Sequence, residues 1–449
     1  MVDILDLEYA SKGRDIDISE PILSYLELKY NLKIVRKCCF KDWQYYLLKY
    51  KPKIVFIANG IGSLHHFNIV KTAYYLGIKV VTHLSEGDLS GREGSSSSSY
   101  FWGFNKDGVL YEDLHLEWSK KNIDIIVSYT DNISKTKLSG AIGFDKYQLL
   151  KTFFMKKDVF LKKYNKSCFS KIVGIAGWGF DQLIIDYLDI NIPHESLDVF
   201  SQENKRNAFL SKDLVNEIIR EVIVKNPDVL FILKHHPLMD DESYSEFCGL
   251  LEYENTLLLK TEEVIYDIIN VCDIWGAYES TTNMEAWLIG NKPTLIIQPI
   301  ENDFKRSLIA SGCPALRNSD DFNSFIEEFY EKGEVSSFNQ LESTRKEIIT
   351  RIIQWSDGKN HQRAAEYICE LYNTPISRRP QLNMFILRVY IRFIYKKFTK
   401  QIRRLLRLPI YRDNRFNDEE REHWHQIYLK AVKNFHQEKY IDENKESLS

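Results

Sequence analysis

The chain has 449 residues, of which 44% are hydrophobic and 27% are charged, and its formal net charge is -3. A chain of this length exceeds one ordinary hydrophobic core and favours two α/β domains with an additional segment. The composition is that of a globular protein, and the nearly balanced charge excludes a global attraction to nucleic acid. A charge-driven partner must therefore meet a local patch.

The seven cysteines match neither a disulfide framework nor a zinc site in their spacing. We interpret them as reduced thiols of a cytoplasmic protein. The N-terminus lacks the basic and apolar regions of a signal peptide, and no uncharged stretch reaches the roughly 18 residues that span a bilayer. The sequence therefore predicts a protein on the cytoplasmic side of the membrane.

Short β-branched runs alternate with helix-length segments in the first third of the chain. We expect strands at 53–57, 78–82 and 123–128, in the rhythm of a parallel sheet. The segment 85–105 follows the second of these strands and carries several glycines and a run of serines at 95–99. This composition predicts a mobile loop beside a strand end, where ligands are contacted.

A second series of strands follows a lysine-rich helical stretch at 151–166. The expected strands, the fourth of them weak, are 172–176, 229–234, 256–259, 271–275 and 294–298. Apolar strands joined by helices predict two doubly wound sheets, each covered on both faces, with sites at the carboxyl ends and in the cleft between domains. We therefore expect domains at 1–165 and 166–370, followed by a tail at 371–449.

The tail opens with a basic segment that contains no acidic residue from Leu371 to Arg412 but eleven lysines and arginines. Apolar residues are interleaved with these cations between 384 and 395. The pattern predicts a basic amphipathic helix, and residues 378–407 suit an anionic membrane surface. The alternative is a helix that packs its apolar side on the domains and leaves a solvated basic face. No nucleic-acid-binding motif accompanies the charge, so we expect no nucleic-acid partner.

An apolar strand that begins at Leu230 ends in a basic turn closed by Pro237. Such a turn can hold a phosphate, because His236 can donate a hydrogen bond to a phosphate oxygen and Lys234 can add charge. We include His235 and Pro237 in this candidate site. The alternative is a structural turn without a ligand.

A run of hydroxyl side chains, Ser280, Thr281 and Thr282, precedes a helix after the weak strand. These hydroxyls can cap the helix while they face an anion, and Glu279 stands next to them. Simple capping is the alternative. Both this run and the histidine turn fall at strand ends of one domain, and their joint occurrence favours a nucleotide site.

The first domain carries an acidic turn after the strand at 78–82. Glu86 is the candidate general base, because a carboxylate beside Gly87 could take the proton of an attacking sugar hydroxyl. Asp88 could serve instead. A turn residue without catalytic consequence is the competing interpretation.

Together these stretches resemble the motif set of bacterial GT-B glycosyltransferases that use CMP-activated ulosonic acids, namely sialyltransferases, polysialyltransferases and Kdo transferases of capsule synthesis. The motifs occur in the family's order as Ser85-Glu86-Gly87, His236-Pro237 and Ser280-Thr281-Thr282, and the resemblance covers residues 1 to about 365. The His-Pro and Ser/Thr motifs are also similar to those of CDP-glycerol glycerophosphotransferases.

The resemblance implies two Rossmann-like domains that face a cleft, the first for the acceptor and the second for the nucleotide sugar. It also implies that Glu86 acts as the base and that His236, Thr281 and Thr282 bind the phosphate of the cytidine nucleotide. The family's acidic motif has two carboxylates before the glycine, whereas this chain has Ser85 in the first place.

Two further patterns are similar to those of surface carbohydrate biosynthesis proteins. One is the pair Arg14-Asp15 after the first strand, and the other is a glycine-containing turn at 140–145 that ends in Phe-Asp. In the second domain, Gly177 and Gly179 would let the backbone approach the donor, or would form a plain turn.

The hypothesis is a metal-independent transferase without a cofactor that builds a surface polysaccharide, such as capsule or lipopolysaccharide, on a glycan or lipid-linked acceptor. It would work at the inner face of the bacterial membrane. One alternative is polyol-phosphate transfer from CDP-glycerol. Another is a non-catalytic GT-B-like scaffold that docks a glycan assembly complex on the membrane.

Overall fold

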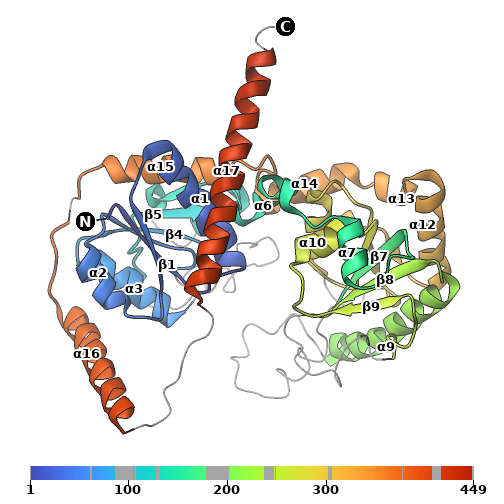
Figure 1. The fold of residues 1–449 in the computed structure, drawn as a ribbon, viewed down its shortest axis with the longest axis horizontal. Coiled ribbons are helices and arrows are strands. Elements are labelled where there is room, and N and C mark those ends of the chain that lie inside the picture. Colours follow the sequence, from blue (N-terminus) through green and yellow to red (C-terminus); the bar gives the residue numbers. More distant parts are fainter. Residues whose placement is uncertain are drawn as a thin grey trace. The chain divides into compact units, whose positions relative to one another are not determined.

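The computed structural model of the chain (Figure 1) describes residues 2–60, 63–85, 105, 108–127, 132–177, 202–236, 247, 249–301, 306–376, 378–406 and 416–446. The chain forms two compact units. Unit 1 comprises Met1–Leu150 and Thr350–Ser449, and unit 2 comprises Lys151–Ile349. The chain therefore leaves unit 1, builds unit 2 and returns to unit 1.

These divisions differ from the expected ones at 165 and 370. The helix after residue 156 belongs to unit 2, because the Lys157 ammonium lies 2.8 Å from both carboxylate oxygens of Asp273. The helix after residue 359 belongs to unit 1, because Asp145 accepts hydrogen bonds from the backbone N–H of His361 at 2.7 Å and from its imidazole at 2.8 Å.

Unit 1 contains a six-stranded parallel sheet in the order β2-β1-β3-β4-β5-β6. Its strands are β1 (Ile4–Glu8), β2 (Ile34–Cys38), β3 (Ile54–Ile57), β4 (Lys79–His83), β5 (Leu114–Glu117) and β6 (Thr136–Leu138). Its helices before residue 150 are α1 (Arg14–Tyr30), α2 (Trp43–Tyr50), α3 (Leu64–Tyr75), α5 (Lys120–Val127), η1 (Ile133–Lys135), η2 (Ile142–Phe144) and α6 (Lys146–Leu149).

The expected strands at 53–57 and 78–82 are confirmed as β3 and β4. The expected strand at 123–128 is wrong, because residues 123–127 lie in helix α5. The hydroxyl of Ser119 accepts a hydrogen bond from the backbone N–H of Asn122 at 3.2 Å. This side-chain cap satisfies a first-turn donor and favours a helix over a strand.

Unit 2 contains a second six-stranded parallel sheet in the order β12-β11-β10-β7-β8-β9. Its strands are β7 (Lys171–Ala176), β8 (Val229–Lys234), β9 (Thr256–Leu259), β10 (Ile274–Ala277), β11 (Thr294–Ile297) and β12 (Ala315–Leu316). Its helices are η3 (Lys151–Phe153), α7 (Lys157–Lys163), α9 (Gln202–Lys225), α10 (Ile265–Val271), α11 (Thr282–Leu288), η6 (Leu308–Gly312), α12 (Ser319–Lys332), α13 (Ser336–Asn339) and α14 (Glu342–Ile353), whose last turn crosses into unit 1. All the strands expected in this half are present, although the weak one begins three residues later than expected.

The C-terminal segment is an integral part of unit 1. It contains α15 (Asn360–Asn373), α16 (Met384–Leu405) and α17 (Asp418–Glu446). Helix α17 packs along α1 (Figure 1), with Tyr428, Ala431 and Val432 buried. The Tyr428 hydroxyl donates a hydrogen bond to Asp17 at 2.7 Å, so this carboxylate has a structural role.

A buried ionic network joins α17 to the first strand. The Arg421 guanidinium contacts the carboxylate of Glu8 at 2.5 Å and also bonds Glu20, which pairs with Arg36 at 2.5 Å and with the His425 imidazole at 2.8 Å. These arginines hold the pKa of Glu20 below its usual range despite its burial. Burial and the neighbouring Glu8 raise the pKa of Asp6. Although the Asp6, Glu8 and Glu20 oxygens lie within 4.8 Å of one another, two guanidinium groups already supply their countercharge.

Helix α16 lies against α3 and beside α2. Its first turn is capped by Asn383, whose side chain accepts a hydrogen bond from the backbone N–H of Ile386 at 3.0 Å. Val389 packs on the core beneath these helices, and the Tyr390 hydroxyl donates to the carbonyl of Gln44 at 3.3 Å. Among the helices that the structure describes, α16 included, none has both the length and the apolar character needed to cross a bilayer.

Candidate functional site

The carboxyl edge of the unit 2 sheet brings together the turns that the sequence singled out in that unit. Strand β7 lies between β10 and β8. The chain proceeds from β7 to β8 and β9 on one side and later to β10 and β11 on the other, so the topological switch point lies between β7 and β10. In open α/β sheets this is where ligands bind. Gly177 follows β7 directly, and its N–H donates to the carbonyl of Lys234 at 2.7 Å.

The histidine turn follows β8 at this edge. The Lys234 ammonium donates to the carbonyls of His235, at 3.0 Å, and of Lys260, so it fixes the turn. His235 is buried, and its Nδ1 lies 2.9 Å from the carbonyl of His236, which assigns the proton to Nδ1. Among the residues that the structure describes, none forms a hydrogen bond with the Nε2 of His235. His236 is half-buried, and Pro237 lies outside the described residues.

The hydroxyl run follows β10 at the same edge. Ser280 accepts a hydrogen bond from the backbone N–H of Thr282 at 3.2 Å, and the two hydroxyls lie 2.8 Å apart. The Trp275 indole also donates to the Thr282 hydroxyl at 2.9 Å. Ser280 and Thr282 therefore close the turn, as the capping interpretation requires. The exposed side chain of the three is that of Thr281.

An arginine that the sequence reading missed stands beside this run. Arg306 is 3.6 Å from Glu279, its guanidinium lies 4.4 Å from the centre of the Tyr278 ring, and its side chain is only 9% exposed. The backbone N–H of Ser307 also donates to Glu279, at 3.3 Å. Glu279 thus anchors the segment after β11. The signal available in the sequence was a cation nine residues beyond the apolar strand β11, which ends at the same edge.

In unit 1, the acidic turn follows β4. Its first residue, Ser85, is buried, and the preceding carbonyl of Leu84 accepts a hydrogen bond from the Trp118 indole at 2.7 Å. The two candidate bases, Glu86 and Asp88, lie outside the described residues, as does Gly179 in unit 2.

Arg14 is the first residue of α1 and is exposed. It follows Gly13, whose φ of 90° suits glycine. The switch point of this sheet lies between β1 and β3, so Arg14 stands at the edge where a ligand of unit 1 would bind. Its role as a binding residue stays a prediction.

The glycine-containing turn at 140–145 has a structural role. Gly140 has a φ of 82°, and a side chain there would collide with Asn360. Asp145 is buried and holds His361, so the turn docks α15 on unit 1.

No family profile matches the chain, and no curated protein matches its sequence. Solved structures do match. The Staphylococcus aureus MnaA–UDP complex aligns over 85% of this chain and 100% of its own, with a TM-score of 0.52 and 12% identity. A UDP-N-acetylglucosamine 2-epimerase aligns over 85% and 99%, with a TM-score of 0.55 and 12% identity. The wall teichoic acid polymerase TagF aligns over 84% and 90%, with a TM-score of 0.52 and 12% identity.

The chain has the GT-B fold. The likeness to these structures and the two parallel six-stranded sheets of the chain agree on this point. The expected architecture of two Rossmann-like doubly wound domains is thus confirmed. At this level of identity, the comparison concerns the fold alone.

Proposed function

We propose that this GT-B protein is a glycosyltransferase that takes a sugar from a pyrimidine nucleotide bound to unit 2 and adds it to a surface glycan. The observation that carries the proposal is the carboxyl edge of the unit 2 sheet. The histidine turn and the hydroxyl run end on either side of Gly177, beside the switch point. Imidazole, hydroxyl and guanidinium donors at one edge suit a phosphate.

In the proposed reaction, the acceptor hydroxyl oxygen forms a bond to the anomeric carbon, and the bond from that carbon to the phosphate oxygen breaks. Glu86 takes the hydroxyl proton, with Asp88 as the alternative base. His236 and Thr281 donate hydrogen bonds to the departing phosphate, which carries the displaced electron pair. No metal or other cofactor takes part in this scheme.

For the donor, the motif set supports a CMP-activated ulosonic acid such as Kdo or a sialic-acid-like sugar. UDP is named with one of the structural neighbours, and UDP-N-acetylglucosamine with another. A uridine nucleotide sugar is therefore the competing donor. The similarity in fold to TagF keeps polyol-phosphate transfer as the second candidate reaction.

We also propose that α16 holds the protein on the inner face of a bacterial membrane. Its apolar side chains at helical spacing are each more than half exposed, namely Met384, Leu387, Ile391, Ile394 and Phe398. The helix contains no acidic residue, and arginines and lysines flank the apolar stripe. An exposed apolar stripe between cations complements an anionic lipid surface.

The experiment is a donor screen with a lipid-linked acceptor. Purified protein is incubated with CMP-Kdo, CMP-sialic acid, UDP-N-acetylglucosamine or CDP-glycerol, and nucleotide release and the product are measured. We expect release from a CMP-ulosonic acid. Transfer of glycerol phosphate would establish the second reaction, and release from none of these donors would reject catalysis and favour the scaffold.

Two substitutions test the roles. His236→Ala should weaken nucleotide binding at least ten-fold, by removing a charge-assisted hydrogen bond. His423→Ala, at an exposed histidine of α17, is the control and should change nothing. Glu86→Gln should leave binding intact and lower turnover. Full turnover in Glu86→Gln would show that Glu86 is not the general base, and Asp88 would become the candidate.

A further inference from the structure

A polar pocket of about 490 Å³ lies between α16 and the first turns of α2 and α3. These helices follow β2 and β3, so the pocket stands at the carboxyl edge of the unit 1 sheet. From α16 it is lined by four cations, namely Arg392, Lys396, Lys397 and Lys400. Asp42 and His65 are among the residues that line the opposite side.

The charge in this pocket is unbalanced. Asp42 is the one carboxylate among the described residues that line it, and an ion pair with Lys397 occupies this group. The side chains of Arg392, Lys396 and Lys400 form no hydrogen bond or ion pair with the residues that the structure describes. Cations that share a pocket repel one another, and a multiply charged anion would relieve this repulsion.

The opposite wall is rigid and polar. The Nε2 of His65 lies 2.7 Å from the carbonyl of Cys39, which assigns a proton to this nitrogen. The ring of His65 stacks on Phe40 with centroids 4.7 Å apart, and the edge of Trp43 closes the wall at 6.2 Å. The pocket therefore keeps its shape on the side of the sheet, while long cationic side chains reach in from α16.

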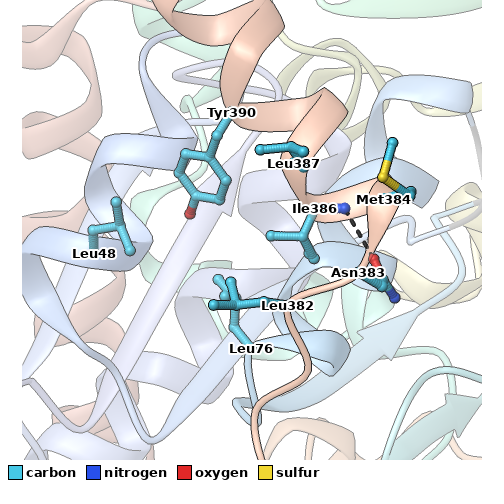
Figure 2. A pocket seen from close by; sticks show the side chains of 8 residues that line it. All are labelled: Leu48, Leu76, Leu382, Asn383, Met384, Ile386, Leu387 and Tyr390. Carbon is cyan, nitrogen blue, oxygen red and sulfur yellow. Dashed lines mark hydrogen bonds between the residues drawn. The ribbon is translucent and has the colours of Figure 1, made fainter.

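An apolar pocket of about 630 Å³ lies further toward the start of α16. Figure 2 shows Tyr390, Leu387 and Ile386 of α16 together with Leu48 of α2 and Leu76 after α3. The Tyr390 hydroxyl bonds the carbonyl of Gln44, and Gln44 lines the polar pocket, so the two pockets adjoin. A cationic pocket thus stands next to an apolar one along the same helix.

We propose that these adjoining pockets bind the diphosphate and the first hydrocarbon units of a lipid-linked acceptor. This inference rests on the proposed function and specifies its acceptor class, a long-chain alkyl or isoprenyl diphosphate. A lipid diphosphate carries more negative charge than a phospholipid diester, which matches three cations without a protein countercharge. A soluble anion would use the polar pocket but would leave the adjoining apolar pocket without a role.

The test is a binding assay without nucleotide donor, so that its outcome is separate from turnover. Full-length protein is mixed with phosphatidylcholine vesicles that contain farnesyl diphosphate, or with vesicles that contain phosphatidylglycerol adjusted to the same surface potential. We expect about ten-fold tighter binding to the diphosphate vesicles, since charge-assisted contacts to phosphate add to general attraction. Equal binding to both would reduce α16 to an unspecific membrane anchor and overturn the proposal.

A matched pair of variants locates the contacts. K396Q/K400Q removes two cations of the pocket, whereas R403Q/R404Q removes two cations from the last turn of the same helix, outside both pockets. Both lose the same charge, so general attraction to either vesicle should fall alike. We expect the preference for diphosphate to vanish in K396Q/K400Q alone. Its persistence there, with the fold intact by circular dichroism, would overturn the assignment.

A third variant distinguishes a lipid from a soluble anion. Leu76→Gln places an amide in the apolar pocket and should weaken binding of the farnesyl diphosphate vesicles about ten-fold, while inorganic diphosphate binds as before. If Leu76→Gln leaves lipid binding unchanged, the pocket serves a soluble anion and the lipid assignment falls. If no donor supports transfer while the preference for diphosphate vesicles persists, the proposed reaction is rejected and the assignment of this pocket stands.

Discussion

His83 stands at the end of β4, directly before the turn that leads to the candidate base. It is completely buried beside the backbone of Gly140 and Leu84. Burial lowers its pKa to about 3, because a charged imidazole would lose its hydration there. The His83 imidazole is therefore neutral in the folded protein.

We predict that His83 makes the stability depend on pH in mildly acidic solution. The folded pKa lies below the ordinary value of 6.5, so the unfolded chain takes up the proton first and stability falls as the pH drops below 6.5. The loss should be about 2 kcal/mol at pH 5 relative to pH 7. Urea titrations at both pH values measure it. The variant His83→Leu should show a smaller loss, and a loss identical to that of the native chain would reject this cause.

Polar residues at the candidate site divide into those that build the turns and those that remain for a ligand. Lys234, Ser280 and Thr282 are engaged by their own turns, whereas Thr281 is exposed and the Nε2 of His235 has no partner in the described part of the chain. Sequence reasoning could find both turns, because strand ends and hydroxyl runs are local patterns. It could not predict which side-chain atoms remain available to a ligand, since this depends on neighbours such as Trp275.

At the scale of elements, α17 decides whether β1 can be a buried strand. Strand β1 has five residues, of which two, Asp6 and Glu8, carry carboxylates, and both are buried. A carboxylate in such a place is stable only with a countercharge. Arg421 supplies it to Glu8 from 413 residues further along the chain.

We predict that Arg421→Met destabilises unit 1 by about 3–5 kcal/mol, the usual cost of leaving one partner of a buried ion pair behind. Chemical denaturation followed by circular dichroism measures the change. Lys433→Met, at an exposed position of the same helix, is the control and should stay within about 0.5 kcal/mol. Addition of Glu8→Gln to Arg421→Met should recover part of the loss. Equal stability of the two methionine variants would show that the network contributes little.

At the scale of the whole molecule, the sequence of unit 2 is inserted between the two segments that form unit 1. Unit 2 is continuous in sequence and has its own sheet and core, whereas unit 1 needs both ends of the chain. A continuous unit with its own core can fold alone. A chain that ends before α17 would leave Glu8 of β1 buried without Arg421.

We predict that residues 151–353, which retain all of α14, fold independently and bind the nucleotide donor. Residues 1–376, which lack α16 and α17, should be unfolded or aggregated. Cooperative thermal unfolding and calorimetric titration with the donor found by the screen measure the first outcome, and solubility and circular dichroism measure the second. A folded 1–376 fragment would contradict the structural role assigned to α17.

The sequence by itself determined β3 and β4 of unit 1, β7 to β11 of unit 2, the turns at the edge of unit 2 and the basic helix α16. Each of these features follows from a pattern of neighbouring residues, such as periodicity, a strand end or a run of like charge. Only the tertiary structure decided that Arg421 compensates the buried Glu8 of β1, that 140–145 docks a helix, and that Arg306 belongs to the candidate site. In each case the deciding contact is made by a residue that is distant in the chain, so a local sequence pattern cannot reveal it.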